Sequence, residues 1–148
     1  MTIAQTSTTS FKVELFQAVH NFGPTTPNTF KVALYTAASD IGPATTAYTA
    51  TNEVVGTGYT AGGNTLAIST DPTSGNNDAS TPTAFVSFSN TSWASSSITA
   101  RGALIYNSTQ GNKSVAVLDF GADKTTANAT FLITFPAADA SSAIIRIS

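Results

Sequence analysis

The fold is decided by residues 98–120, which read ITARGALIY (98–106), NSTQGNK (107–113) and SVAVLDF (114–120). Two runs rich in β-branched and other apolar residues flank a polar loop that contains a glycine, which is the usual pattern of a β-hairpin. Arg101 interrupts the first run, and Asp119 lies near the end of the second. The stretch therefore predicts a hairpin whose strands can bring these two opposite charges together across the ladder.

Further apolar or alternating runs on both sides of this hairpin predict the remaining strands, and turn signals separate them. The runs lie at residues 30–37, 65–70, 83–89, 130–135 and 143–147. Because helices do not alternate with these strands, a parallel α/β sheet is excluded. The pattern favours an all-β protein, an antiparallel two-sheet sandwich of about seven or eight strands with jelly-roll or immunoglobulin-like topology.

One short helix is expected near the start of the chain. Phe11, Leu15 and Val19 recur at a helical spacing, which predicts one apolar stripe. Residues 1–9 are mostly small and polar, which predicts a flexible N-terminal arm. The predicted organisation is therefore this arm followed by a single β-sandwich domain at residues 10–148.

Two stretches between the predicted strands are candidates for binding sites. Residues 51–64 contain four glycines, but they lack the ending and the strict spacing of a phosphate-binding loop. We interpret them as a tight connection beside the sheet, where glycine permits close backbone approach. Residues 71–82 are uniformly polar and are predicted to form a long loop, a kind of segment that is often functional or mobile. The single tryptophan, Trp93, is expected to fill one end of the core.

Charged residues make up only 9% of the chain, against roughly 25% in ordinary soluble domains. Serine, threonine and alanine take their place. A surface rich in hydroxyl groups is cheaper to desolvate than a charged one, provided that new hydrogen bonds form, so it suits extended packing in an assembly. The alternative is that threonine is common only because it favours strands, and composition leaves both interpretations open.

Several functional classes find no support in the composition. The formal net charge is −2 and the six basic residues are scattered, so nucleic acid is not an expected partner. Without cysteine there is neither a disulfide framework nor a thiolate metal site. No apolar run is long enough for a membrane span, and the first residues lack the basic and apolar blocks of a signal peptide. No cofactor is expected.

The sequence also gives little basis for catalysis. His20 is the only histidine, and no serine lies in the glycine-flanked turn that a hydrolase nucleophile needs. Asp119 and Asp123 could serve as paired acids, but they lie close together in the sequence, at and just beyond the end of the predicted hairpin, and near the basic residues Arg101 and Lys124. We therefore interpret Arg101, Asp119, Asp123 and Lys124 as a structural ion-pair cluster or a subunit contact, and we assign no catalytic, cofactor-binding or metal-binding residue.

Six stretches together resemble a known group of proteins. They read FKVALYT (30–36), NEVVGTGYTAGG (52–63), TARGALIYN (99–107), VLDFGADK (117–124), FPAAD (135–139) and IIRI (144–147). In this combination and order, over residues 11–148, they resemble small structural proteins encoded by tailed bacteriophages and prophages. That group has no motif that assigns catalysis, so the resemblance implies a non-enzymatic virion protein.

The resemblance implies a location in the phage particle, after synthesis in the cytoplasm of the bacterial host. The preferred role is a capsid cement or decoration protein that stabilises the shell by binding across capsomers. Its partners would be the major capsid protein or other virion proteins, and it would form a homo-oligomer, a dimer or a trimer. Two alternatives remain: a neck, tail or head-fibre component, and a glycan- or receptor-binding module of the virion.

Overall fold

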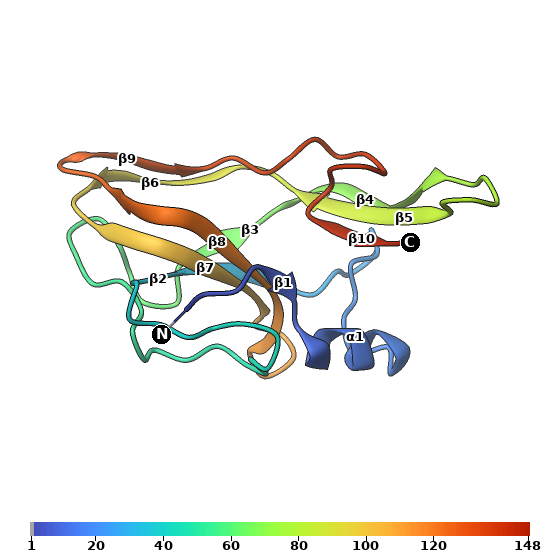
Figure 1. Cartoon of the computed structure of the whole chain (residues 1–148), viewed down its shortest axis with the longest axis horizontal. Coiled ribbons are helices and arrows are strands. Elements are labelled where there is room, and N and C mark those ends of the chain that lie inside the picture. The colour runs from blue at the N-terminus through green and yellow to red at the C-terminus, as the bar shows by residue number, and fades with distance from the viewer. Residues whose placement is uncertain (1) are drawn as a thin grey trace.

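The computed structural model describes residues 2–148, and these form one helix and ten strands in three antiparallel sheets (Figure 1). The five-stranded sheet has the order β1-β8-β7-β2-β3, the three-stranded sheet β10-β5-β4 and the two-stranded sheet β6-β9. The elements are β1 (Thr6–Ser7), α1 (Thr9–Phe16), β2 (Phe30–Tyr35), β3 (Asn64–Leu66), β4 (Ile68–Asn76), β5 (Thr83–Phe88), β6 (Thr91–Ser96), β7 (Thr99–Asn107), β8 (Lys113–Thr125), β9 (Ala129–Ile133) and β10 (Ile145–Ile147). The prediction of a mostly β, antiparallel protein with one short helix is confirmed.

The predicted hairpin is the pair β7–β8, and it runs through the middle of the five-stranded sheet. Leu104 and Ile105 of β7 are fully buried, because β7 has a strand on each side and side chains packed on both faces. The ladder extends further than predicted, to the pair Thr99↔Thr125. Between Ala100↔Lys124 and Gly102↔Asp119 the ladder contains a bulge on β8, where Gly121 has a φ of 75°. The bulge lets β8 continue past Phe120, where the predicted strand ended.

The long loop predicted at residues 71–82 is wrong in extent. β4 continues through Asn76 and pairs with β5, for example at Thr73↔Phe85, so that only residues 77–82 connect the two strands. In Figure 1 this hairpin extends beyond the rest of the molecule. Most residues of β4 are exposed and none is buried. Its sequence therefore lacks the alternation of hydrophobic and polar residues that indicates a strand.

The N-terminal segment does not form the expected free arm. Ile3 is only 5% exposed and belongs to a buried cluster with Leu104 and Val117. Thr6 and Ser7 pair with β8 and thereby form an edge strand of the sheet. This segment was missed because Ile3 is the only large apolar residue in the sequence between Thr2 and Thr9, and pairing of two residues with a sheet edge leaves no periodic signal.

Helix α1 is shorter than the predicted apolar stripe. It begins after Thr8, whose side-chain oxygen accepts a hydrogen bond from the backbone N–H of Phe11, so Thr8 is the N-cap. It ends at Phe16, and Ala18 then adopts a φ of 56°. Val19 therefore lies outside the helix.

One large core cluster contains residues from all three sheets and from α1. Trp93 is 4% exposed and packs against Tyr59 and Phe131, so its predicted place in the core is confirmed. Large apolar side chains also remain at the surface, namely Val13, Phe16, Val55, Leu132 and Ile147. Within residues 2–148, no helix is long and apolar enough to cross a membrane.

Candidate interaction surface

The structure brings two of the four predicted site residues together. Arg101 Nε lies 3.3 Å from Asp119 Oδ1, and about a third of each side chain is exposed to solvent. Asp119 also accepts a hydrogen bond from the backbone N–H of Gly121, at 2.8 Å. This backbone hydrogen bond and the neighbouring guanidinium outweigh partial desolvation and hold the pKa of Asp119 below its ordinary value. The ion pair thus links β7 to the bulge of β8.

The other two predicted residues do not join this pair. Asp123 and Lys124 lie on the far side of the bulge and are exposed, and neither forms an ion pair within the described part of the chain. The predicted ion-pair cluster of four residues is therefore wrong for Asp123 and Lys124, and a subunit contact at these residues stays a prediction. Four residues of β8 separate the partners of Ala100 and Gly102, and a bulge of this kind cannot be read from the charge pattern.

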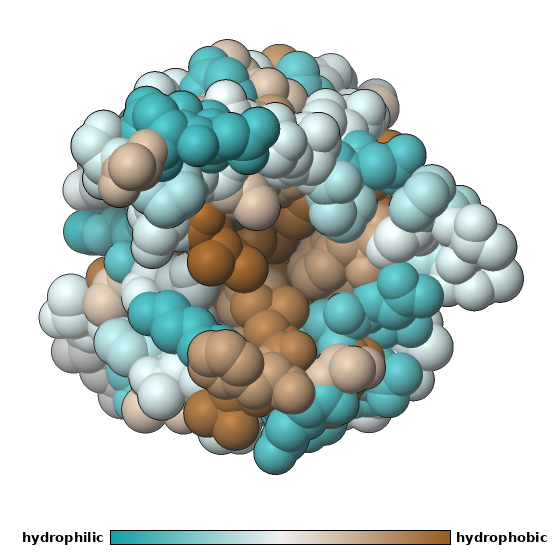
Figure 2. Space-filling model, turned by 90° about the vertical axis from the view of Figure 1, so that its right-hand side faces the viewer, coloured by the Kyte–Doolittle hydropathy of each residue, from teal (hydrophilic) through white to brown (hydrophobic). Residues whose placement is uncertain are grey.

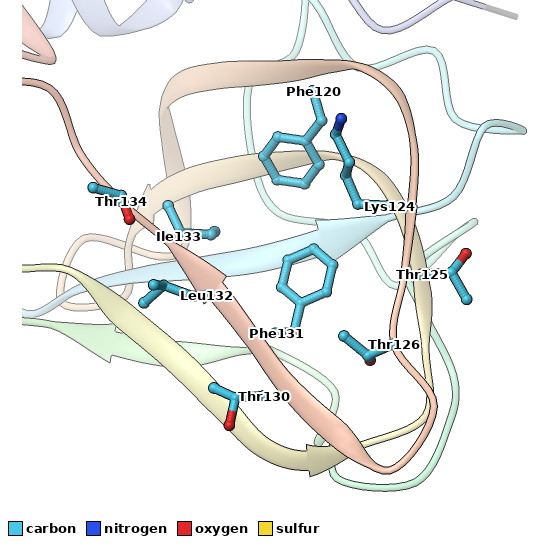
Figure 3. A pocket seen from close by; sticks show the side chains of 9 residues that line it. All are labelled: Phe120, Lys124, Thr125, Thr126, Thr130, Phe131, Leu132, Ile133 and Thr134. Atoms are coloured by element: carbon cyan, nitrogen blue, oxygen red, sulfur yellow. The ribbon is translucent and has the colours of Figure 1, made fainter.

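Lys124 instead lines a surface groove between β8 and β9, with a volume of about 400 Å³. Figure 3 shows its nine lining residues, and the rings of Phe120 and Phe131 point toward each other across the opening. Their centroids are 6.1 Å apart. Leu132, which also lines the groove, is 58% exposed. Lys124 is the only lining residue that carries a charge.

The groove exists because the outer edge of β8 is only partly covered. On that side of the sheet β1 pairs with Ala116 and Val117, and Ala47 bridges to Lys113. Beyond Leu118, β8 has no paired strand there among the described residues. An uncovered sheet edge beside partly or fully exposed apolar side chains, here Phe120 and Leu132, is a common feature of protein–protein contact surfaces. We define the β8–β9 groove by Phe120, Lys124, Phe131, Leu132 and Ile133.

Two buried polar networks were not anticipated from the sequence. The first network surrounds Glu53, which belongs to the glycine-rich segment at residues 51–64 and is 7% exposed. Its carboxylate accepts hydrogen bonds from the hydroxyl groups of Tyr48 and Tyr59, at 2.7 and 2.6 Å, and from the N–H of Gly62, at 2.7 Å. Burial and the hydrogen bond to this carboxylate raise the pKa of Tyr48 to about 12.

This first network explains the glycine-rich segment. A side chain at Gly63 would collide with the backbone of Val32, and Gly62 and Gly63 both have positive φ angles. Glycine is therefore required for the close approach to β2, which confirms the interpretation as a tight connection beside the sheet. The clue in the sequence was a glutamate surrounded by tyrosines and glycines, but residue spacing alone could not show that they meet.

The second network connects α1 to the end of the central hairpin. Glu14 Oε2 lies 2.7 Å from His20 Nε2, and Glu14 Oε1 accepts a hydrogen bond from Lys113 Nζ at 2.8 Å. The amide nitrogen of Asn107 is 3.0 Å from His20 Nδ1. Burial alone would raise the pKa of Glu14, but the hydrogen bonds and charges of Lys113 and His20 outweigh it and lower that pKa. The sole histidine thus holds the helix against the sheet.

Glu14, His20, Glu53 and Tyr59 line none of the five surface hollows described for residues 2–148. Within residues 2–148, no three histidine, aspartate or glutamate side chains come together as a metal ion would require. No protein family, curated protein or solved structure matches the chain. The surface features that stand out are therefore grooves and exposed apolar side chains.

Proposed function

We propose that this chain is a non-enzymatic structural protein of a tailed-bacteriophage particle, and that it binds the outside of the capsid shell across capsomers as a cement or decoration protein. The resemblance of residues 11–148 to small phage structural proteins supports this assignment. Its partners would be the major capsid protein or other virion proteins, and it would act as a dimer or trimer at a local symmetry axis.

The observation that carries the proposal is a surface with exposed apolar side chains and few charges. Phe16 and Val55 are 95% and 94% exposed, and three further large apolar side chains are more than half exposed. They stand on a surface with few charges, since only 9% of all residues are charged. Apolar side chains surrounded by hydroxyl groups favour burial in permanent contacts, because few ions have to lose their hydration.

We also propose that the three sheets form a two-layer sandwich. The supporting observation is the core cluster, in which Leu34 and Ile105 of the five-stranded sheet lie together with Val86 and Trp93 of the smaller sheets. Figure 1 draws the five-stranded sheet below the other two. Such a rigid body would carry the exposed residues on fixed elements, which lowers the entropy cost of binding to a shell.

The mechanism follows from mass action. A protein that binds the assembled shell but not its separated subunits stabilises the shell in proportion to the logarithm of its free concentration over its dissociation constant. A small contact that is repeated around a symmetric lattice therefore stabilises the whole shell strongly.

The test is binding to particles. Particles from the phage or prophage that encodes the chain are prepared with and without it, and the purified protein is added back. We expect saturable binding over the head surface by cryo-electron microscopy and greater resistance of the head to heat. Copies confined to one vertex or to the tail would indicate the neck or tail alternative, and absence from the particle would refute the proposal.

A further inference from the structure

A second apolar groove lies at the opposite end of the molecule, between α1 and β10. Figure 2 shows hydrophobic side chains in a hollow at the centre of this face, framed by more hydrophilic ones. Two adjoining hollows, of about 170 and 460 Å³, share Phe11, Leu15 and Ile147. Ile147 is 61% exposed and Phe16, on the rim, is 95% exposed. We call this the α1–β10 groove.

The groove exists because no strand pairs with β10 on the side that faces α1 and the edge of the five-stranded sheet. β10 pairs with β5 on one side only, and β1 is the edge of the five-stranded sheet. Ser7 of β1 and Ile147 of β10 line the same hollow. An edge strand directs half of its backbone N–H and C=O groups away from its sheet. The groove therefore offers free backbone hydrogen-bonding groups of β10 beside an apolar surface.

The charges around the groove are basic. Among the side chains that line it, only those of Lys12 and Arg146 are charged, in a chain whose net charge is −2. Arg146 donates hydrogen bonds to the carbonyl groups of Ala140 and Ser141, and Asp139 is near enough to offset part of its charge. Lys12 is exposed and forms no ion pair within residues 2–148.

We propose that the α1–β10 groove binds an extended, acidic segment of a partner protein, which adds one strand to the free edge of β10. Alternate side chains of such a segment would lie over Leu15 and Ile147, and its carboxylates would face Lys12 and Arg146. Three residues of β10 span about 10 Å, so a short segment suffices. A second copy of this chain is disfavoured, because a two-fold contact at this groove brings Lys12 and Arg146 toward their own copies. This inference is independent of the proposed function.

The test uses ¹⁵N-labelled protein and two short synthetic peptides. One alternates valine or isoleucine with aspartate, and the control peptide has lysine in place of aspartate. We expect the acidic peptide to shift the amide signals of residues 145–147, and to slow their hydrogen exchange, at concentrations at which the lysine peptide does neither. Equal shifts with both peptides, or none with the acidic peptide at millimolar concentration, would overturn the proposal.

Matched variants locate the binding. Lys12→Glu and Ile147→Asp should weaken binding of the acidic peptide by roughly tenfold or more. Lys124→Glu and Val55→Asp make the same chemical changes on exposed residues outside this groove and should leave binding unchanged. In Lys12→Glu the lysine peptide should bind better than it does to the original chain. Loss of binding in all four variants, or a dimer in sedimentation that Ile147→Asp abolishes, would contradict a groove for an acidic partner segment.

Discussion

Replacing Glu53 with alanine should be among the most destabilising single changes in this chain. The change removes a buried carboxylate that accepts three hydrogen bonds of 2.6–2.7 Å and leaves Tyr48, Tyr59 and the N–H of Gly62 without that acceptor. Each hydrogen bond to a charged group contributes about 1.5–3 kcal/mol. Relief of the carboxylate's desolvation offsets part of the sum, so we expect a loss of about 3–5 kcal/mol in the free energy of unfolding.

The assay is equilibrium unfolding in urea, followed by the fluorescence of Trp93, whose ring centroid lies 5.8 Å from that of Tyr59. Glu53→Gln keeps an acceptor oxygen and should cost about 1–2 kcal/mol. Asp123→Ala, which removes an exposed carboxylate, should change stability by less than about 0.5 kcal/mol. A loss below about 1 kcal/mol for Glu53→Ala, at an unchanged slope with urea, would refute the role of this network.

Three further predictions concern the remaining interactions. Arg101→Ala should cost only about 0–1 kcal/mol in urea unfolding, because the Arg101–Asp119 pair is partly exposed; a larger loss would show that the bridge fixes the bulge. Ile3→Ala should cost about 2–4 kcal/mol, measured in the same way, because Ile3 is buried; no loss would restore the idea of a free arm. The lowered pKa of Glu14 should add stability that is present above its ordinary pKa of 4.5 and is lost as the pH falls through the lower value in the folded protein. Urea unfolding at neutral pH and at about pH 3 should show this loss, and it should be smaller in Glu14→Gln; equal acid sensitivity would place the effect elsewhere.

The raised pKa of Tyr48 predicts a loss of stability at alkaline pH. Because the pKa of Tyr48 is raised to about 12 in the folded protein, its contribution to stability is fully present below its ordinary pKa of 10 and is lost as the pH rises through 12. In a pH titration, the tyrosinate absorbance of Tyr48 should therefore appear at a higher pH than that of an ordinary tyrosine. In Glu53→Gln the same titration should move to lower pH, and an unchanged titration would contradict the contact between these two side chains.

The sequence predicted the central hairpin, the antiparallel β character and a strand at residues 130–135. Phe131, Ile133 and Phe135 alternate along the chain and are all at most 8% exposed, so a two-residue period was a reliable guide. The contact between Arg101 and Asp119 could be predicted because a hairpin brings these parts of its two strands side by side, although the ladder pairs Asp119 with Gly102. Local pattern was informative wherever one face of a strand was buried.

The errors share a physical cause, which is that tertiary contacts contribute no local pattern. No side chain of β4 is buried, so the sequence predicts a loop where the structure pairs β4 with β5. The segment around Ile3 is held by pairing with β8, which lies more than a hundred residues later in the chain. The bulge at Gly121 separated Lys124 from Asp119, and both grooves arise where sheet edges meet in space.

The central claim, a structural protein that covers the phage head, is tested most directly by the number of copies per particle. Quantitative mass spectrometry of purified particles, with labelled peptides of this chain and of the major capsid protein, gives their ratio. The proposal predicts a fixed, simple ratio to the major capsid protein, as a protein bound at repeated positions of the lattice requires. A count that matches a single vertex or ring, or no copies at all, would contradict it.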